Sequence, residues 1–246
     1  MGLDEDLVGA VDRHEILAYY QPQIDLATGA IVAVEALSRW QHPSRGLLQP
    51  NLFIGIAEQS DLILEIGDEM IDNGCRCSRL WGVEVAVNVS AAQLATTEFF
   101  EHLMTRLTAE SLGQNAITVE ITESKAIADP ELVAQRLSEL RDLGVDISID
   151  DFGSGFSSLD QVLNLPVSEV KLDRSLIQGH LGESESVMTS IIAIAHARGI
   201  RVVAEGIETA AHLDLARRLG CDRAQGYLLG MPTPENEVRE LLRAHA

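Results

Sequence analysis

Carboxylate, amide and amine side chains recur at or near the ends of consecutive strand-like segments of this sequence. They are Glu35, Asn88, Glu120, Asp150, Lys171, Glu205 and Gln225, with a second aspartate at Asp151. Carboxylate and amide oxygens are ligands that suit Mg²⁺ or Mn²⁺, and no Cys or His of the kind that Zn²⁺ prefers accompanies them. Any one of these residues alone could be an ordinary surface group. Their recurrence at corresponding positions predicts a metal site.

Asp150 and Asp151 are adjacent carboxylates at the point where the apolar run Ile147–Ile149 ends. Two neighbouring residues where the pleat ends can point to different sides of one cavity, so Asp150 could bridge two cations. Gly153 and Gly155 follow, and they allow the backbone to turn tightly away. A glycine-rich loop by itself is weak evidence of a site, but beside a double aspartate at a strand end it supports one.

Short β-rich runs alternate with amphipathic helical stretches along the chain. The predicted strands are 17–25, 31–39, 83–90, 116–123, 146–151, 169–173, 201–207 and 224–229, and the predicted helices include 61–80, 130–143, 184–198 and 209–219. This pattern over 246 residues predicts a (β/α)8 barrel of the TIM type, whose active site lies at the C-terminal ends of its strands. A doubly wound open sheet is the alternative.

The alternation of side chains within the predicted strands favours the barrel. In the third strand, Val85 and Val87 lie on one face, and Ala86 and Asn88 lie on the other. A valine face suits packing under helices, whereas a face of small and polar groups suits a barrel interior that ends in a site. A doubly wound sheet would be apolar on both faces.

Composition and charge narrow the classes of function. The sequence has 18 Lys and Arg against 38 Asp and Glu, for a net charge of −20. This charge disfavours binding to DNA, RNA or anionic membrane surfaces, and an anionic substrate would need bound cations. No apolar run reaches the ~18 residues of a membrane helix, and the acidic start of the chain does not resemble an export signal. Three cysteines cannot form a disulfide framework, so we expect a reduced, cytoplasmic setting.

Several of these segments also match the motifs of a known family. Glu35–Arg39 reads EALSR, and further along come NVS at 88–90, EITE at 120–123, DDFGSG at 150–155, KLD at 171–173, EGIE at 205–208 and QGY at 225–227. The chain resembles the EAL-domain cyclic-di-GMP phosphodiesterases from about Leu17 onward. So many ordered motifs at barrel spacing make the resemblance highly specific. Ser154, Phe156 and Met231 depart from the usual pattern, and none of them is a proposed metal ligand.

The resemblance implies roles for individual residues. It implies that the first barrel strand runs antiparallel to the others and that the site binds two ions of Mg²⁺ or Mn²⁺, with Ca²⁺ inhibitory. The metal ligands would be Glu35, Asn88, Glu120 and Asp150 for one ion, and Asp150, Asp151 and Glu205 for the second ion or for a water in its place. The catalytic and substrate-binding residues would be Lys171 at the water or scissile phosphate, Glu123 bracing the loop after Asp151, Arg39 at a phosphate, and Gln21 and Gln225 at the dinucleotide.

These roles predict the hydrolysis of cyclic di-GMP to linear pGpG, which would lower a second-messenger level in bacterial signalling. Lys171 and Glu205 are both candidates for the general base. The alternatives are a catalytically silent receptor for cyclic di-GMP, disfavoured because every proposed metal ligand is present, and a protein-interaction module that has lost the nucleotide. The second is disfavoured because Arg39 and Gln225 also remain.

We expect one EAL domain over residues 1–246, in which residues 1–16 form a lead-in helix. We also expect a homodimer that associates through the Asp151–Leu159 region. The chain could stand alone or belong to a longer, membrane-anchored parent with sensory or GGDEF domains.

Overall fold

Ten strands and their connecting helices account for most of the described chain. The computed structural model describes residues 2–109, 112–122, 129–153, 165–179 and 183–244. The strands are β1 (Ile16–Asp25), β2 (Ile31–His42), β3 (Gly46–Leu48), β4 (Glu84–Asn88), β5 (Ile117–Thr122), β6 (Asp146–Phe152), β7 (Glu169–Leu172), β8 (Arg201–Ala204), β9 (Arg223–Gln225) and β10 (Thr233–Pro234). The helices are α1 (Leu3–Leu7), η1 (Pro50–Leu52), α2 (Ile54–Ala57), α3 (Leu62–Trp81), α4 (Ala91–Ala95), α5 (Thr97–Ala109), α6 (Pro130–Asp142), α8 (Arg174–Gln178), α9 (Glu183–Ala197), α10 (Ala210–Leu219) and α11 (Glu235–Ala244).

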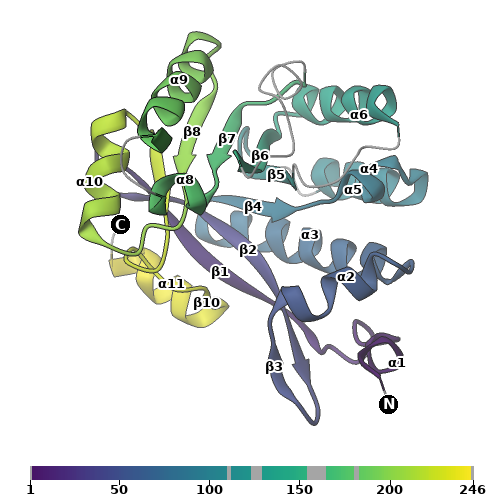
Figure 1. The fold of residues 1–246 in the computed structure, drawn as a ribbon. Coiled ribbons are helices and arrows are strands. Elements are labelled where there is room, and N and C mark those ends of the chain that lie inside the picture. The colour runs from purple at the N-terminus through teal and green to yellow at the C-terminus, as the bar shows by residue number, and fades with distance from the viewer. Residues whose placement is uncertain (1, 110–111, 123–128, 154–164, 180–182, 245–246) are drawn as a thin grey trace.

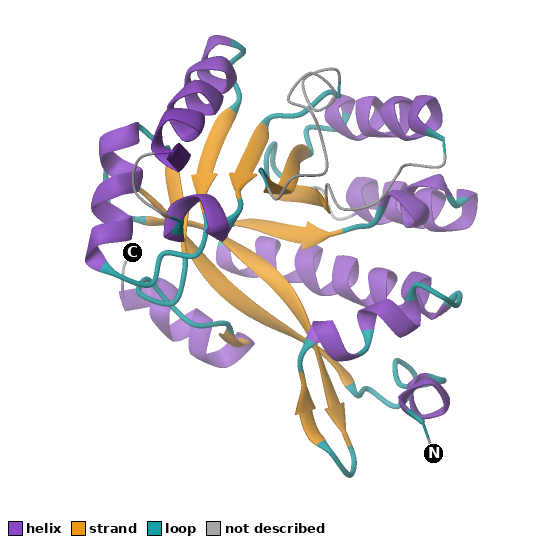
Figure 2. Ribbon diagram, viewed as in Figure 1, coloured by secondary structure: helices purple, strands orange, loops and turns teal. Residues whose placement is uncertain are grey.

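Eight of the strands close into a barrel. The order around it is β1-β9-β8-β7-β6-β5-β4-β2, and a long β1–β2 pairing completes the circle. β1 is antiparallel to both of its barrel neighbours, β2 and β9, whereas the pairs from β2–β4 round to β8–β9 are parallel. Helices surround the strands, as Figures 1 and 2 show. The TIM-type barrel and its antiparallel first strand are therefore confirmed.

Local signals in the sequence set the ends of several helices. The Asp129 side chain caps α6 by accepting a hydrogen bond from the Leu132 N–H, and Pro130 takes the first helical position. Gly220, at φ +89°, ends α10 in the left-handed conformation that glycine adopts without a steric penalty. The expected lead-in helix over residues 1–16 is only partly present: α1 ends at Leu7, turns follow, and β1 begins at Ile16.

The outer face of the barrel carries its apolar core. Val85 and Val87 are buried on the side of β4 that faces α3, and a Cβ added to Gly74 of that helix would lie 2.6 Å from a Val87 methyl carbon. The helix backbone therefore lies directly on the strand. Full burial of a valine contributes about 1.5–3 kcal/mol, so this face supplies much of the stability.

The interior of the barrel is small and polar, and ion pairs close its lower end. Ala86, Thr118 and Ser148 point inward along adjacent strands and are fully or almost fully buried. At the N-terminal ends of the strands, Glu84 and Glu169 pair with Arg201 and Arg223 at distances of 2.6–3.6 Å. With this end filled by charged side chains, the C-terminal end is left for a site. Among the described helices, none has the length and apolar character that crossing a membrane requires.

Candidate metal centre and active site

A single buried amine lies at the centre of the C-terminal end of the barrel. Lys171 Nζ is 3.2 Å from Glu35 Oε2, 2.8 Å from Glu120 Oε2, 3.1 Å from Asp150 Oδ1 and 2.8 Å from Glu205 Oε1. The Lys171 side chain is 1% exposed. Four of the carboxylates predicted from the sequence thus meet around the nitrogen of a fifth predicted residue, although they lie in or directly after strands from β2 to β8.

Burial and charge crowding shift the pKa values of the amine and of three of its acidic neighbours. Burial would lower the pKa of Lys171, but the four carboxylates outweigh it and raise that pKa well above its usual value. Burial and the nearby Glu35 charge raise the pKa of Glu120 well above its ordinary range, and burial raises the pKa of Glu205 to about 8. Burial would also raise the pKa of Glu35, but Lys171 and two amide donors lower it. One ammonium group is too little charge for four carboxylates.

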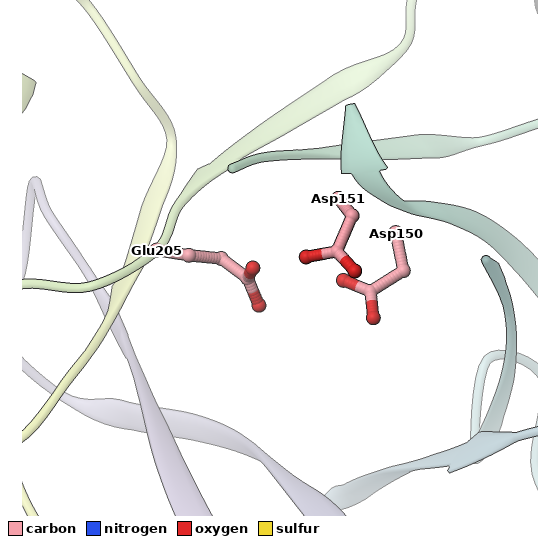
Figure 3. Close-up of side chains that lie close together, drawn as sticks. All are labelled: Asp150, Asp151 and Glu205. Carbon is pink, nitrogen blue, oxygen red and sulfur yellow. The ribbon is translucent and has the colours of Figure 1, made fainter. Parts of the chain in front are cut away.

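Three carboxylates at the mouth of the cluster form a group that can hold a cation. One oxygen from each of Asp150, Asp151 and Glu205 lies within 4.8 Å of the others, and Figure 3 shows the three side chains turned toward one another. Asp151 is held at φ +56°, where β6 shifts its register against β7, so the two aspartates leave the strand in different directions. Burial and the adjacent Asp150 raise the pKa of Asp151 to about 6.

The chemistry of these donors fits a divalent cation. Glu120 Oε1 and Asp150 Oδ1 are buried oxygens without a hydrogen-bond partner among the described residues, and Asp150 Oδ1 lies 3.1 Å from the Lys171 ammonium. Buried acceptors of this kind normally have partners. A hard cation would supply them and would return the raised carboxyl pKa values toward their ordinary range.

The amide side chains of the site hold Glu35 in place. Asn88 Nδ2 donates to Glu35 Oε1 at 2.7 Å, and Gln225 Nε2 donates to Glu35 Oε2 at 2.5 Å. Gln225 Nε2 also contacts Gln21 Oε1 at 3.1 Å, and Gln21 donates to the Gly230 carbonyl at 2.9 Å. Both glutamines are buried and also line a cavity at the mouth of the barrel. Binding of the two glutamines to a dinucleotide stays a prediction. What the structure shows is that Gln225 orients the Glu35 carboxylate and that Gln21 contacts Gln225.

Arg39 makes none of the ion pairs of the Lys171 cluster. Arg39 is 6% exposed, donates to the Ser38 carbonyl at 2.8 Å, and lies 5.5 Å from the centroid of the Tyr19 ring. Its contact with a phosphate stays a prediction. Glu123 falls outside the described residues, as do Ser154, Phe156 and most of the Asp151–Leu159 region expected at a dimer interface.

Two cavities open on the cluster. One, of about 420 Å³, has a largely apolar wall that includes Leu37, Ile54 and Met70. The other, of about 510 Å³, is lined by Asp151 and Glu205 and by four residues that sequence reasoning left without a role: Asp173, Arg174, Glu208 and Tyr227. Asp173 could have been found, because it ends the Lys171-Leu172-Asp173 segment and lies directly after the strand that carries the lysine, at the end of the barrel where the site lies.

Comparison with known proteins gives a consistent result. The family model of the EAL domain matches residues 4–232. The bifunctional diguanylate cyclase/cyclic di-GMP phosphodiesterase MucR of Pseudomonas aeruginosa is 38% identical over 241 residues, which cover 95% of this chain and 35% of MucR. The cyclic di-GMP phosphodiesterase RocR of the same species is 35% identical over 237 residues, covering 94% of this chain and 60% of RocR. The chain thus spans about a third to three fifths of these relatives.

Solved structures agree with this assignment. The PaMucR phosphodiesterase in its c-di-GMP complex superposes with a TM-score of 0.89 at 38% identity, covering 97% of this chain and all of that one. The EAL enzyme Bd1971 bound to cAMP and cyclic di-GMP gives a TM-score of 0.91 at 33% identity, covering 98% of this chain and 68% of that one.

Proposed function

Because the chain belongs to the EAL domain family, we propose that it is a phosphodiesterase that hydrolyses cyclic di-GMP to linear pGpG with Mg²⁺ or Mn²⁺. The observation that carries the proposal is the convergence of Glu35, Glu120, Asp150 and Glu205 on buried Lys171. A receptor that no longer cleaves would have no need of so costly an arrangement of uncompensated buried carboxylates.

The metal ligands would be Glu35, Asn88, Glu120, Asp150, Asp151 and Glu205, arranged for two ions. When bound, the ions would neutralise the phosphodiester, lower the pKa of the attacking water and stabilise the leaving oxygen. Asn88 and Gln225 fix the orientation of Glu35 toward them, and the buried walls of the barrel exclude bulk water.

Lys171 and Glu205 divide the proton chemistry between them in this proposal. The carboxylates hold Lys171 protonated, so its Nζ acts as a donor that orients the water or a phosphate oxygen. Glu205 lies at the mouth of the cluster, 2.8 Å from that donor, and its carboxylate accepts the proton of the water. Of the two candidates for the general base, we therefore favour Glu205.

The test is chromatography of the nucleotide after incubation with each cation. With Mg²⁺ or Mn²⁺ we expect pGpG, and with Ca²⁺ we expect bound, uncleaved cyclic di-GMP, because Ca²⁺ accepts more and longer oxygen contacts and polarises water less effectively. Glu35→Gln should abolish cleavage, whereas Glu101→Gln, the same change at an exposed position of α5, should leave it intact. Tight binding without cleavage in Mg²⁺ and Mn²⁺ would favour a receptor, and absence of both would favour an interaction module.

Further roles stay predictions for the whole protein. MucR is named as both a cyclase and a phosphodiesterase, which supports a longer parent protein with a GGDEF domain for this chain as well. A homodimer and a cytoplasmic location are likewise proposals. Sedimentation of the wild type and of Phe156→Asp would test the dimer, and a strictly monomeric, fully active wild type would contradict it.

A further inference from the structure

Arg174 is a cation in an acidic cavity, and no residue that the structure describes pairs with its side chain. It is the first residue of α8 and lines the 510 Å³ cavity together with Asp151, Glu205 and Glu208. It is exposed, and it makes no hydrogen bond or ion pair with any residue that the structure describes. Among the described residues that line this cavity, it is the sole cation. An arginine among carboxylates would be expected to pair with one of them, so the absence of a partner among the described residues calls for an explanation.

The backbone of Arg174 is fixed beside the metal ligands. Gly206, at φ +66°, follows Glu205, and a Cβ added there would lie 2.4 Å from Arg174 Cβ and 3.2 Å from its Cα. Gln178 Nε2, one turn along α8, donates to the Gly206 carbonyl at 2.9 Å. The start of α8 is therefore held against the segment that carries Glu205, and the Arg174 side chain extends from there into the lining of the cavity.

The helix itself gains nothing from an arginine at this position. Positive charge in the first turn of a helix opposes the helix dipole, which favours acidic residues there. Asp173 already caps the helix by accepting a hydrogen bond from the Ser175 N–H at 2.9 Å. Stabilisation of the helix therefore does not explain why an arginine stands at this position. Its planar guanidinium carries several N–H donors, which suit a phosphate group.

We propose that Arg174 captures the substrate by binding the phosphate of cyclic di-GMP that is not cleaved. This inference rests on the proposed function. The substrate has two phosphates, and the metal cluster takes the scissile one, so a cation at the rim of the same cavity is placed for the other. In a chain of net charge −20, an exposed guanidinium also counteracts the local repulsion of a dianion. The contact is present before and during the reaction alike, so it should act on KM and leave kcat unchanged.

The test compares Arg174→Gln with Arg198→Gln. Arg198 follows α9 and precedes β8, at the opposite end of the barrel, so it gives the same change of charge away from the site. For Arg174→Gln we expect KM for cyclic di-GMP to rise about 10- to 100-fold, the range for loss of a charge-assisted hydrogen bond, with kcat within about twofold. Arg198→Gln should match the wild type. Arg174→Lys should restore part of the affinity, because it retains the charge but not the fork of donors.

Binding with Ca²⁺ in place of Mg²⁺ provides a readout independent of turnover. The Kd for cyclic di-GMP, measured by calorimetry, should weaken in Arg174→Gln by the same factor as KM, and its dependence on salt should become shallower. An unchanged Kd, or a fall in kcat with KM unaltered, would overturn the capture role. If the wild type binds cyclic di-GMP but does not cleave it, the proposed hydrolysis is contradicted, and the comparison of Kd values still tests the role of Arg174. Absence of binding by the wild type would overturn it as well.

Discussion

Replacing Lys171 by methionine should destabilise the metal-free protein strongly and the cation-loaded protein much less. Lys171 Nζ is the single cation within 3.2 Å of carboxylates from Glu35, Glu120, Asp150 and Glu205 among the described residues. Methionine has a similar length and no charge, so the barrel loses little volume. What it loses is the charge that compensates four buried acids.

The size of the effect follows from burial. Removing one partner of a buried ion pair costs about 3–5 kcal/mol, because the other charge is left without compensation. For a domain of this size each kcal/mol lowers Tm by about 2–4 °C, so the metal-free variant should melt roughly 6–20 °C below the wild type. A divalent cation supplies the missing positive charge, and the gap between variant and wild type should narrow when it is present.

Thermal unfolding followed by circular dichroism, in chelator and in Mg²⁺, measures both differences. Glu101→Gln serves as a control for an exposed position, and it should leave Tm unchanged in either buffer. Equal Tm values for wild type and Lys171→Met in chelator would show that the ammonium does not compensate the cluster. A gap of the same size in both buffers would show that no cation enters it.

Three further predictions concern the dependence of stability on pH, the ion pairs at the N-terminal end of the barrel, and the loop around Gly226. The pKa of the Glu205 carboxyl is raised from 4.5 to about 8, so protonated Glu205 contributes to the stability of the fold. In chelator this contribution, on the order of a few kcal/mol, should be complete below about pH 4.5 and lost as pH rises through 8. Urea unfolding from pH 5 to 8 should show a falling free energy of unfolding, and a rising one would contradict the prediction. Glu84→Gln should lower the free energy of unfolding by about 2–4 kcal/mol, because it leaves Arg223 without its 2.7 Å carboxylate partner. KM should stay unchanged, and a shifted KM would show that the N-terminal end of the barrel affects the site. Gly226→Ala should reduce both stability and turnover, since its Cβ would lie 2.2 Å from the Ile207 backbone nitrogen. A variant with the Tm and kcat of the wild type would contradict this prediction, because it would show that the loop can shift to admit the methyl group.

The barrel could be predicted because its strands alternate so regularly. Val85 and Val87 against Ala86 and Asn88 already distinguish an apolar outer face from a polar interior. Polar residues at the strand ends then indicate which end holds the site. The antiparallel direction of β1 came from the resemblance alone, since a strand's own side-chain pattern carries no information about the direction of its neighbours.

Partnerships between side chains could not be predicted in the same way. Gln225 donates to Glu35 across 190 residues of chain, and Arg39 lies against Tyr19, because rotamers and packing decide such contacts. Glu84 and Arg201 could equally have been surface charges on pattern alone. Arg174 carries no signal in sequence, since its significance lies in the absence of a described partner within an acidic cavity.

Because Lys171 is buried, chemical labelling of its amine can measure how often the barrel opens. Lys125 and Lys171 are the two lysines of the sequence, and the remaining cationic side chains are arginines. Lys171 is fully buried, so an amine-reactive reagent reaches its nitrogen only when the strands around it separate. Peptide mapping after timed labelling would therefore read the opening rate of the barrel at one residue, without an engineered probe. A ligand that closes the C-terminal end would slow that label, which gives a binding assay independent of catalysis.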